Sequence, residues 1–182
     1  RSVKPDAVFI FYPGKHGVQF FKQYAQSGLK GNIPLYSVFA IDALSLPRIG
    51  DLVEGTLMTQ FWAPDLATPV SKIFVQDYRK KYGRYPTFYA AQSYDTIMLI
   101  DSAVRAVNGD LSNKDGMRAA MRRAAFPSVR GPFRYGNNHM PIQNFYLRKV
   151  VKDAEGNYTT SIVKTVYTNH QDPYAKDCKM SW

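Results

Sequence analysis

Cysteine is almost absent from this chain of 182 residues, and long hydrophobic runs are missing altogether. The single cysteine, Cys178, has no partner within the chain for a disulfide and no second cysteine with which to bind zinc. No stretch approaches the roughly 18 consecutive apolar residues that a membrane-spanning helix needs. The first residues, RSVKPDAVF, lack the basic start, apolar middle and cleavage site of a signal peptide. We therefore expect a mature or truncated chain that is neither a disulfide scaffold nor a membrane-spanning protein.

Sequence motifs of the common enzyme classes are missing as well. There is no G-x-S-x-G turn, no G-x-G-x-x-G after a strand, no phosphate loop ending in Lys-Ser/Thr and no H-E-x-x-H. The histidines at 16, 139 and 170 stand apart, without the further ligands at defined spacing that a metal site requires. We therefore expect neither catalysis nor a bound metal or cofactor.

Positive charge, by contrast, is in excess. The net charge is +10 and the pI about 9.7. The basic residues are dispersed, and the densest groups, at 79–84 and 118–123, fall on segments with helical spacing and predict solvated helix faces. A dispersed excess favours solubility over nucleic-acid binding, so we expect no nucleic-acid partner. The length predicts one domain or two small ones.

The first sixty residues alternate between strand and helix patterns. Short apolar runs at 6–12 (DAVFIFY), 33–39 (IPLYSVF) and 55–61 (GTLMTQF) predict three strands. Helical spacing over 18–27 follows a PGKHG turn, and Asp42 is placed to cap a short second helix that Pro47 ends or kinks near residue 49. Strands separated by helical crossovers pair in parallel, with helices on the faces of the sheet.

The rest of the chain changes character twice. Helices are predicted over 69–82, 88–107 and 112–125, with Thr68, Thr87 and Ser112 at their starts. Apolar residues on more than one side make the helix over 88–107 a core helix, and its Asp95 is expected in solvent. A loop follows, with an extended piece at 129–133. The segments 142–151 and 158–167 then predict a hairpin around the turn at 154–157.

Four segments in this order resemble the second half of the type I periplasmic binding proteins, in the branched-chain amino acid and aromatic-acid branch that serves ABC transporters. They are DAVFIFYPGKHGVQFFKQYAQSGLKGNIPLYS at 6–37, GTLMTQFWAPD at 55–65, PVSKIFVQDYRKKYGRYPTFYAAQSYDTIMLIDSAVRA at 69–106, and GPFRYGNNHMPIQNFYLRKV at 131–150. The resemblance covers nearly all of the chain. It implies an α/β fold of two Rossmann-like, three-layer lobes joined by a hinge.

The resemblance also implies how the chain is divided. Residues 1–62 are expected to form a βαβαβ unit of the second lobe, and residues 63–134 the helices that complete the first lobe. Residues 135–182 are expected to hold the return crossing, a β-hairpin and the C-terminal tail of the second lobe. A missing N-terminal portion of the same protein would supply the rest of the first lobe and a possible disulfide partner for Cys178. Without that portion, we expect residues 1–182 to be poorly stable.

The implied function is that of the solute-binding component of an ABC importer. It would bind a small carboxylate between its lobes, either an amino acid, branched-chain or other, or an aromatic acid. Its partner would be the ABC permease in the membrane, and its location the periplasm, or the outside of the cell in association with the membrane. Two alternatives stay open: an α/β enzyme whose PGKHG turn holds a phosphate-containing cofactor, and a ligand-sensing domain of a regulator.

Six residues are candidates for ligand binding. Lys15 and His16 begin the first helix, where free N–H groups favour an anion by about 0.3–1 kcal/mol, and Tyr12 precedes them. The alternative is that these three side chains are merely exposed or packed on the sheet. The resemblance implies pocket positions at Phe39 and Asp42, after the second strand. Phe39 stands near the position of an acidic residue that holds the ammonium group in amino-acid binders, and this favours an apolar or aromatic ligand.

The sixth candidate, Phe61, ends the third strand beside Gln60 and Trp62. It could line the cleft near the hinge, or it could be an ordinary core aromatic. Asp42 likewise has a simpler role available to it, as a helix cap.

Overall fold

A computed structural model of the chain describes residues 3–180, and its first part is a parallel sheet covered by two helices. Strands β1 (Val8–Ile10), β2 (Leu35–Val38) and β3 (Leu57–Gln60) pair in parallel, in that order. Helices α1 (Lys15–Gln26) and α2 (Leu46–Val53) are the crossovers. The three strands, their parallel pairing and both helices confirm the pattern expected from the sequence, because each apolar run lies between turn signals.

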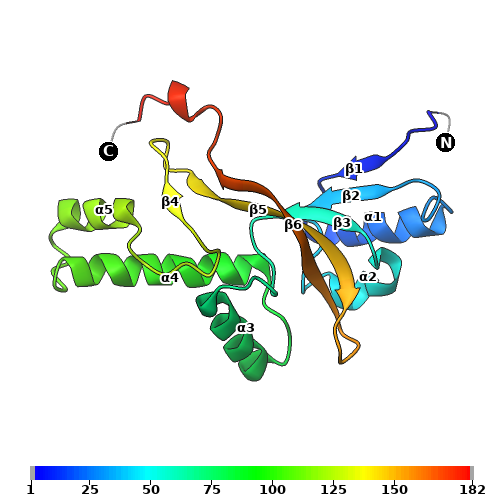
Figure 1. Ribbon diagram of the computed structural model, residues 1–182, viewed down its shortest axis with the longest axis horizontal. Helices are drawn as coiled ribbons and strands as arrows, with labels where there is room; N and C mark the ends of the chain where they lie inside the picture. The colour runs from blue at the N-terminus through cyan, green and yellow to red at the C-terminus, as the bar shows by residue number, and fades with distance from the viewer. Residues whose placement is uncertain (1–2, 181–182) are drawn as a thin grey trace.

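A long hairpin extends this sheet and joins it to the remaining helices. Strands β5 (Pro141–Lys152) and β6 (Tyr158–His170) are antiparallel, as the sequence predicts. The C-terminal part of β5 pairs antiparallel with β3, whereas its first residues pair with the short strand β4 (Arg134–Tyr135). In Figure 1 the hairpin runs from the side that carries α3, α4 and α5 to the side that carries α1 and α2.

Three helices make up most of the other side. They are α3 (Pro69–Tyr82), α4 (Phe88–Ala106) and α5 (Lys114–Arg123). The hydroxyls of Thr68 and Thr87 accept the N–H groups of Ser71 and Ala90, so both threonines are the caps that the sequence predicts. A 3-10 turn, Ala175–Asp177, follows the hairpin.

Buried apolar side chains gather in two clusters. The first cluster lies between the sheet and helices α1 and α2; it includes Phe21, Ile49, Met58 and Val150. The second cluster lies between α3, α4 and the start of the hairpin; it includes Trp62, Phe74, Phe88, Val129 and Tyr146. Strand β5 contributes to both clusters, so the hairpin is a physical link between them.

Several sequence predictions for local structure are wrong. Pro47 does not end α2 but lies in its first turn, where the missing N–H group would have no partner anyway. Helix α5 is capped by Asn113, whose Oδ1 accepts the N–H of Gly116, and not by Ser112. The paired residues after α5 are Arg134 and Tyr135, just beyond the piece expected at 129–133.

Asp95 and its helix α4 also differ from expectation. Asp95 is 1% exposed, because it accepts hydrogen bonds from Ser128 Oγ and the Val129 N–H and pairs with Arg130. The helix buries this face but leaves Ile97 65% and Ile100 43% exposed. The expected core helix therefore keeps one apolar face exposed in the part of the chain described.

Candidate functional site

A cavity of about 220 Å³ lies where the carboxyl ends of β1 and β2 meet the start of α4. Parallel strands carry the loops after them to one edge of a sheet, which is where ligands of open α/β sheets bind. The loop after β1 supplies one wall, the loop after β2 a second, and α4 a third. The lining residues are Gly14, Lys15, Val18, Phe39, Ala40, Asp42, Leu44, Ser45, Arg48 and Tyr89.

The wall after β1 is the first turn of α1. Helix α1 begins at Lys15 without an acidic residue in its first turn, so its first N–H groups face the loop without a negative side chain. The backbone approaches closely at Gly17, where a Cβ atom would lie 2.0 Å from the carbonyl oxygen of Tyr12. Only glycine fits there, and it lets the turn fold tightly against the helix. The turn therefore places the positive charge of Lys15 and the start of a helix at the cavity.

Phe39 forms the aromatic floor of the cavity. Its backbone lies in the left-handed region, with φ of 54°, a conformation that costs a bulky residue about 1–3 kcal/mol. Its ring lies 5.9 Å from the ring of Phe61 and 5.4 Å from that of Phe88, centroid to centroid. The surrounding aromatic packing holds Phe39 in this conformation. Strain of this kind gathers at ligand sites, because a ligand then meets a fixed surface.

Asp42 faces the cavity with a carboxylate that the backbone already uses. Its Oδ1 accepts the N–H groups of Leu44 at 2.9 Å and Ser45 at 3.3 Å. The side chain therefore caps the turn that leads into α2. The N-cap residue of α2 is Ser45, so the expectation that Asp42 caps the helix itself is wrong.

A buried arginine stands behind Asp42. Arg148 is 2% exposed and donates to Thr160 Oγ1 and to the sulfur of Met58. It shares the lining of a small neighbouring cavity with Asp42. The pKa of Arg148 is lowered to about 10, because the effect of burial exceeds the opposing effect of the charges of Asp42 and Asp65. The guanidinium therefore stays charged at neutral pH. The positive charge of Arg148 offsets the negative charge of Asp42 from inside the protein.

The structure brings together three of the six predicted site residues. Lys15, Phe39 and Asp42 line the cavity. Tyr12 is 49% exposed and lies outside the lining, with its ring 5.5 Å from that of Phe20, centroid to centroid. His16 is exposed and also lies outside it. Phe61 is 3% exposed, and its ring packs against that of Phe39 as a core aromatic would.

Among the lining residues that the sequence did not predict, Arg48 and Tyr89 add a charge and a ring to the cavity. Each lies in the first turn of a helix, α2 and α4 respectively. The helix starts are visible in the sequence as Pro47 and Thr87. The two helix starts face each other across the end of β2 because of the way the two clusters pack. No local sequence pattern contains that information.

The cavity can hold a small anion against an aromatic wall. Lys15 and Arg48 provide positive charge, while Phe39 and Tyr89 provide ring surface. Within residues 3–180, no three side chains of His, Cys, Asp or Glu come together as a metal ion would need. In the same range, no helix is both long and apolar enough to cross a bilayer.

Comparison with known proteins extends this picture. The model of a family described as periplasmic binding protein matches residues 1–156. A curated relative, the Leu/Ile/Val-binding protein homolog 6 of Brucella melitensis, is 31% identical over 177 residues. The match covers 93% of this chain but 44% of the relative, so the chain spans about half the length of that protein.

Solved structures match over nearly the whole chain. A solute-binding protein of an ABC transporter from R. palustris, in complex with benzoate, is 32% identical to this chain and superimposes with a TM-score of 0.86. The match covers 98% of this chain and 47% of the R. palustris chain. A second solute-binding protein, from Rhodopseudomonas palustris BisB5 in complex with 3,4-dihydroxybenzoic acid, is 30% identical with a TM-score of 0.83. That match covers 94% of this chain and 47% of the other chain. A leucine-binding protein from Thermotoga maritima, 24% identical with a TM-score of 0.74 and shares of 90% and 45%, shares the fold.

Proposed function

This chain belongs to the periplasmic binding protein family, and from that premise we propose that it is part of the solute-binding component of an ABC importer. Its mixed α/β fold is that of the type I members. We infer that the protein binds a small carboxylate in the periplasm and delivers it to the membrane permease. The relatives named above are binding proteins, which supports binding without catalysis.

The observation that carries this proposal is the composition of the 220 Å³ cavity. Two cations, Lys15 and Arg48, lie at the cavity that Phe39 and Tyr89 line with ring surface. A carboxylate paired with a cation gains a charge-assisted hydrogen bond, and an aromatic ring gains stacking and burial on the phenyl wall. The two cations of this surface match the carboxylate of an aromatic acid, and its aromatic side chains match the ring of the acid.

An aromatic acid fits better than an amino acid. An amino acid needs an acidic group for its ammonium, and Phe39 occupies the position at the end of β2 from which such a group would reach the cavity. Asp42 is the one carboxylate in the lining, and it is engaged by two backbone N–H groups and offset by Arg148. The benzoate and dihydroxybenzoate complexes of the relatives support the same ligand class.

We further infer that the rest of the relatives' length supplies the opposite side of the cleft. The chain spans 44–47% of the proteins that it matches. Residues 1–62 and 135–182 would then form one lobe, and residues 63–134 would complete the other. The first cluster supports this assignment, since its members come from residues 10–58 and from Val150. The second cluster combines residues 66–129 with Phe61, Trp62 and Tyr146, which lie where the chain passes between the two parts.

Calorimetric titration of the full-length protein tests the proposal. Benzoate and 4-hydroxybenzoate are expected to bind more tightly than leucine. Lys15→Gln is expected to weaken benzoate binding by about five- to tenfold, because one charge-assisted contact is lost. The matched control is Lys22→Gln, which removes an exposed charge farther along the same helix. If neither the aromatic acids nor leucine bind, or if both variants behave alike, the assignment of this cavity is wrong.

A further inference from the structure

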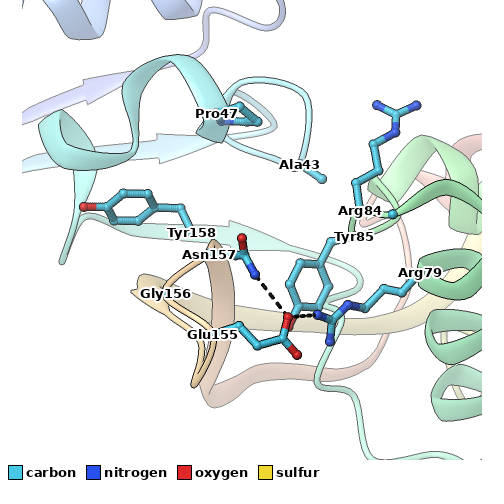
Figure 2. Close-up of a pocket in the computed structure, with 10 residues that line it drawn as sticks. Ala43, Pro47, Arg79, Arg84, Tyr85, Glu155, Gly156, Asn157 and Tyr158 are labelled. Atoms are coloured by element: carbon cyan, nitrogen blue, oxygen red, sulfur yellow. Dashed lines mark hydrogen bonds and ion pairs between the residues drawn. The ribbon is translucent and has the colours of Figure 1, made fainter.

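The two apolar clusters meet along a seam that is longer than the ligand cavity. Three cavities follow one another along it. Asp42 lines both the ligand cavity and the small cavity behind it, and Ala43, Tyr85 and Tyr158 line both this small cavity and a groove of about 640 Å³. The loop between β2 and α2 runs beside all three. The groove, whose lining Figure 2 shows, therefore lies at the end of the seam away from the ligand cavity.

Charged and aromatic side chains bridge the seam at this groove. Arg79, near the end of α3, pairs with Glu155 at 2.8 Å and approaches Asp153 at 3.8 Å. Its guanidinium lies over the ring of Tyr85 at 4.4 Å, and the Tyr85 hydroxyl donates to Asp153 at 3.0 Å. Figure 2 shows Arg79 and Tyr85 reaching toward Glu155, whereas Arg84 points away from the groove.

The bridge connects elements that belong to different clusters. Tyr85 packs against the second cluster, and so does Tyr78, the residue before Arg79 in α3. Asp153 and Glu155 lie in the turn between β5 and β6, directly before Tyr158, which packs against the first cluster. Tyr158 also donates to Asp51 and Glu54, at the end of α2. The turn is therefore fixed to the first cluster, and Arg79 and Tyr85 are fixed to the second.

The turn is arranged to receive these partners. Oδ1 of Asp153 accepts the N–H groups of Glu155 at 3.0 Å and Asn157 at 2.7 Å, which leaves Oδ2 for the Tyr85 hydroxyl. Burial, followed by the hydrogen bond to Asp153, raises the pKa of Tyr85. Because the acceptor is fixed beforehand, little conformational entropy is lost when the bridge forms.

We propose that Arg79, Tyr85, Asp153 and Glu155 form a polar latch that holds the two clusters at the separation needed to grip a ligand at the other end of the seam. The four act as positioning residues, since none of them lines the ligand cavity. This inference rests on the proposed function, because it assigns to the latch the control of cleft closure. The match to the solute-binding protein in complex with benzoate covers 98% of this chain with a TM-score of 0.86, so it includes both clusters. Opening the latch should therefore release ligand faster.

The test uses the full-length protein that contains this chain, with Arg79→Gln as the variant. The benzoate dissociation rate is expected to rise about two- to fivefold, the range for losing partly exposed ion pairs, while association changes less. Arg79→Lys, which keeps the charge, should restore part of the loss. The matched control is Arg105→Gln, which breaks an exposed pair with Asp101 inside α4 alone and should leave the rate unchanged.

A second measurement separates the latch from the ligand assignment. Spin labels at Lys22→Cys on α1 and Lys114→Cys on α5, in a Cys178→Ser background, report the distance between the clusters without any ligand. Arg79→Gln is expected to broaden and lengthen this distance distribution, and Arg105→Gln is not. An unchanged distribution in Arg79→Gln would overturn the latch, even if benzoate binds. A changed distribution in a protein that binds no acid would support the latch and reject the proposed ligand.

Discussion

Asp95 and Arg130 form an ion pair that is almost wholly buried in the second cluster. The Arg130 Nε atom lies 2.7 Å from Asp95 Oδ2, and the side chains are 7% and 1% exposed. Arg130 also donates to Gln143 Oε1 and lies 4.1 Å over the Phe133 ring. The pair joins α4 to β5 and to the loop between α5 and β4. Its charges are tolerated because each has fixed polar or aromatic neighbours.

Asp95→Asn removes one charge of this pair without changing its shape. The substitution leaves Arg130 buried and unpaired, so we expect the free energy of unfolding of the full-length protein to fall by about 3–5 kcal/mol. Urea unfolding followed by circular dichroism measures it. Asp101→Asn, which breaks an exposed pair on the same helix, should cost less than about 1 kcal/mol. Equal losses in the two variants would contradict the importance of burial.

Gly17 should affect the ligand cavity through the turn that precedes Lys15. In Gly17→Ala the new methyl group would lie 2.0 Å from the Tyr12 carbonyl oxygen, so the turn before α1 has to move. Because Lys15 begins that helix, we expect benzoate affinity to fall on the order of tenfold. Titration of Gly17→Ala beside Gln19→Ala, on the exposed side of α1, measures the effect. Unchanged affinity in Gly17→Ala would show that the turn takes no part in binding.

Among the elements, helix α2 packs directly against Tyr158 at the start of β6. Gly50 lies in the middle of α2, and a Cβ atom there would lie 2.0 Å from a ring carbon of Tyr158. The ring can rest on the helix backbone because glycine lacks a side chain. The hydroxyl of the same tyrosine reaches Asp51 and Glu54. Helix α2, the hairpin turn and the polar latch are therefore mechanically connected.

The Gly50→Ala substitution distinguishes the effect of this packing on stability from the effect of helix propensity. Alanine is favoured over glycine in a helix by about 1 kcal/mol, but here we expect a loss of about 1–3 kcal/mol, because the methyl group displaces the Tyr158 ring. Thermal unfolding of the full-length protein measures it. In a Tyr158→Ala background the same substitution should become stabilising. A Gly50→Ala variant that is more stable than the wild-type protein would show that Tyr158 does not rest on α2.

For the molecule as a whole, the largest consequence of the fold is the apolar surface it leaves uncovered. Phe9 and Phe11 are 67% and 59% exposed beside β1, and Ile73 and Ile97 are 60% and 65% exposed on α3 and α4. Soluble proteins seldom leave large apolar side chains exposed in groups. The relatives are about twice as long as this chain.

Residues 1–182 on their own should therefore be poorly stable. We expect the isolated chain to bind a hydrophobic dye, to unfold over a broad temperature range and to associate as its concentration rises, because its apolar faces stay in water. Dye fluorescence and sedimentation measure these properties. The control is the same chain expressed together with the remaining part of the full-length protein. A monomeric isolated chain with a sharp, highly stable unfolding transition would contradict this expectation.

Much of the local structure could be predicted from the sequence. Apolar runs between turn residues define the strands and the hairpin, and Thr68 and Thr87 mark the starts of α3 and α4. The signals that failed were those in which two neighbouring residues compete for one role, as Ser112 and Asn113 do at α5. Helix boundaries near proline failed for a related reason, since Pro47 fits a first turn as well as an end.

The sequence by itself determined the order of the elements, the parallel pairing of β1 to β3 and the edge of the sheet where Lys15 and Phe39 meet, because periodicity and turn chemistry act between near neighbours. The tertiary structure alone decided that Arg48 and Tyr89 share that cavity, that Asp95 is buried against Arg130 and that Arg79 reaches Glu155. These contacts join segments that are far apart along the chain. Their partners are chosen by how the two clusters pack, and that choice leaves no local pattern in the sequence.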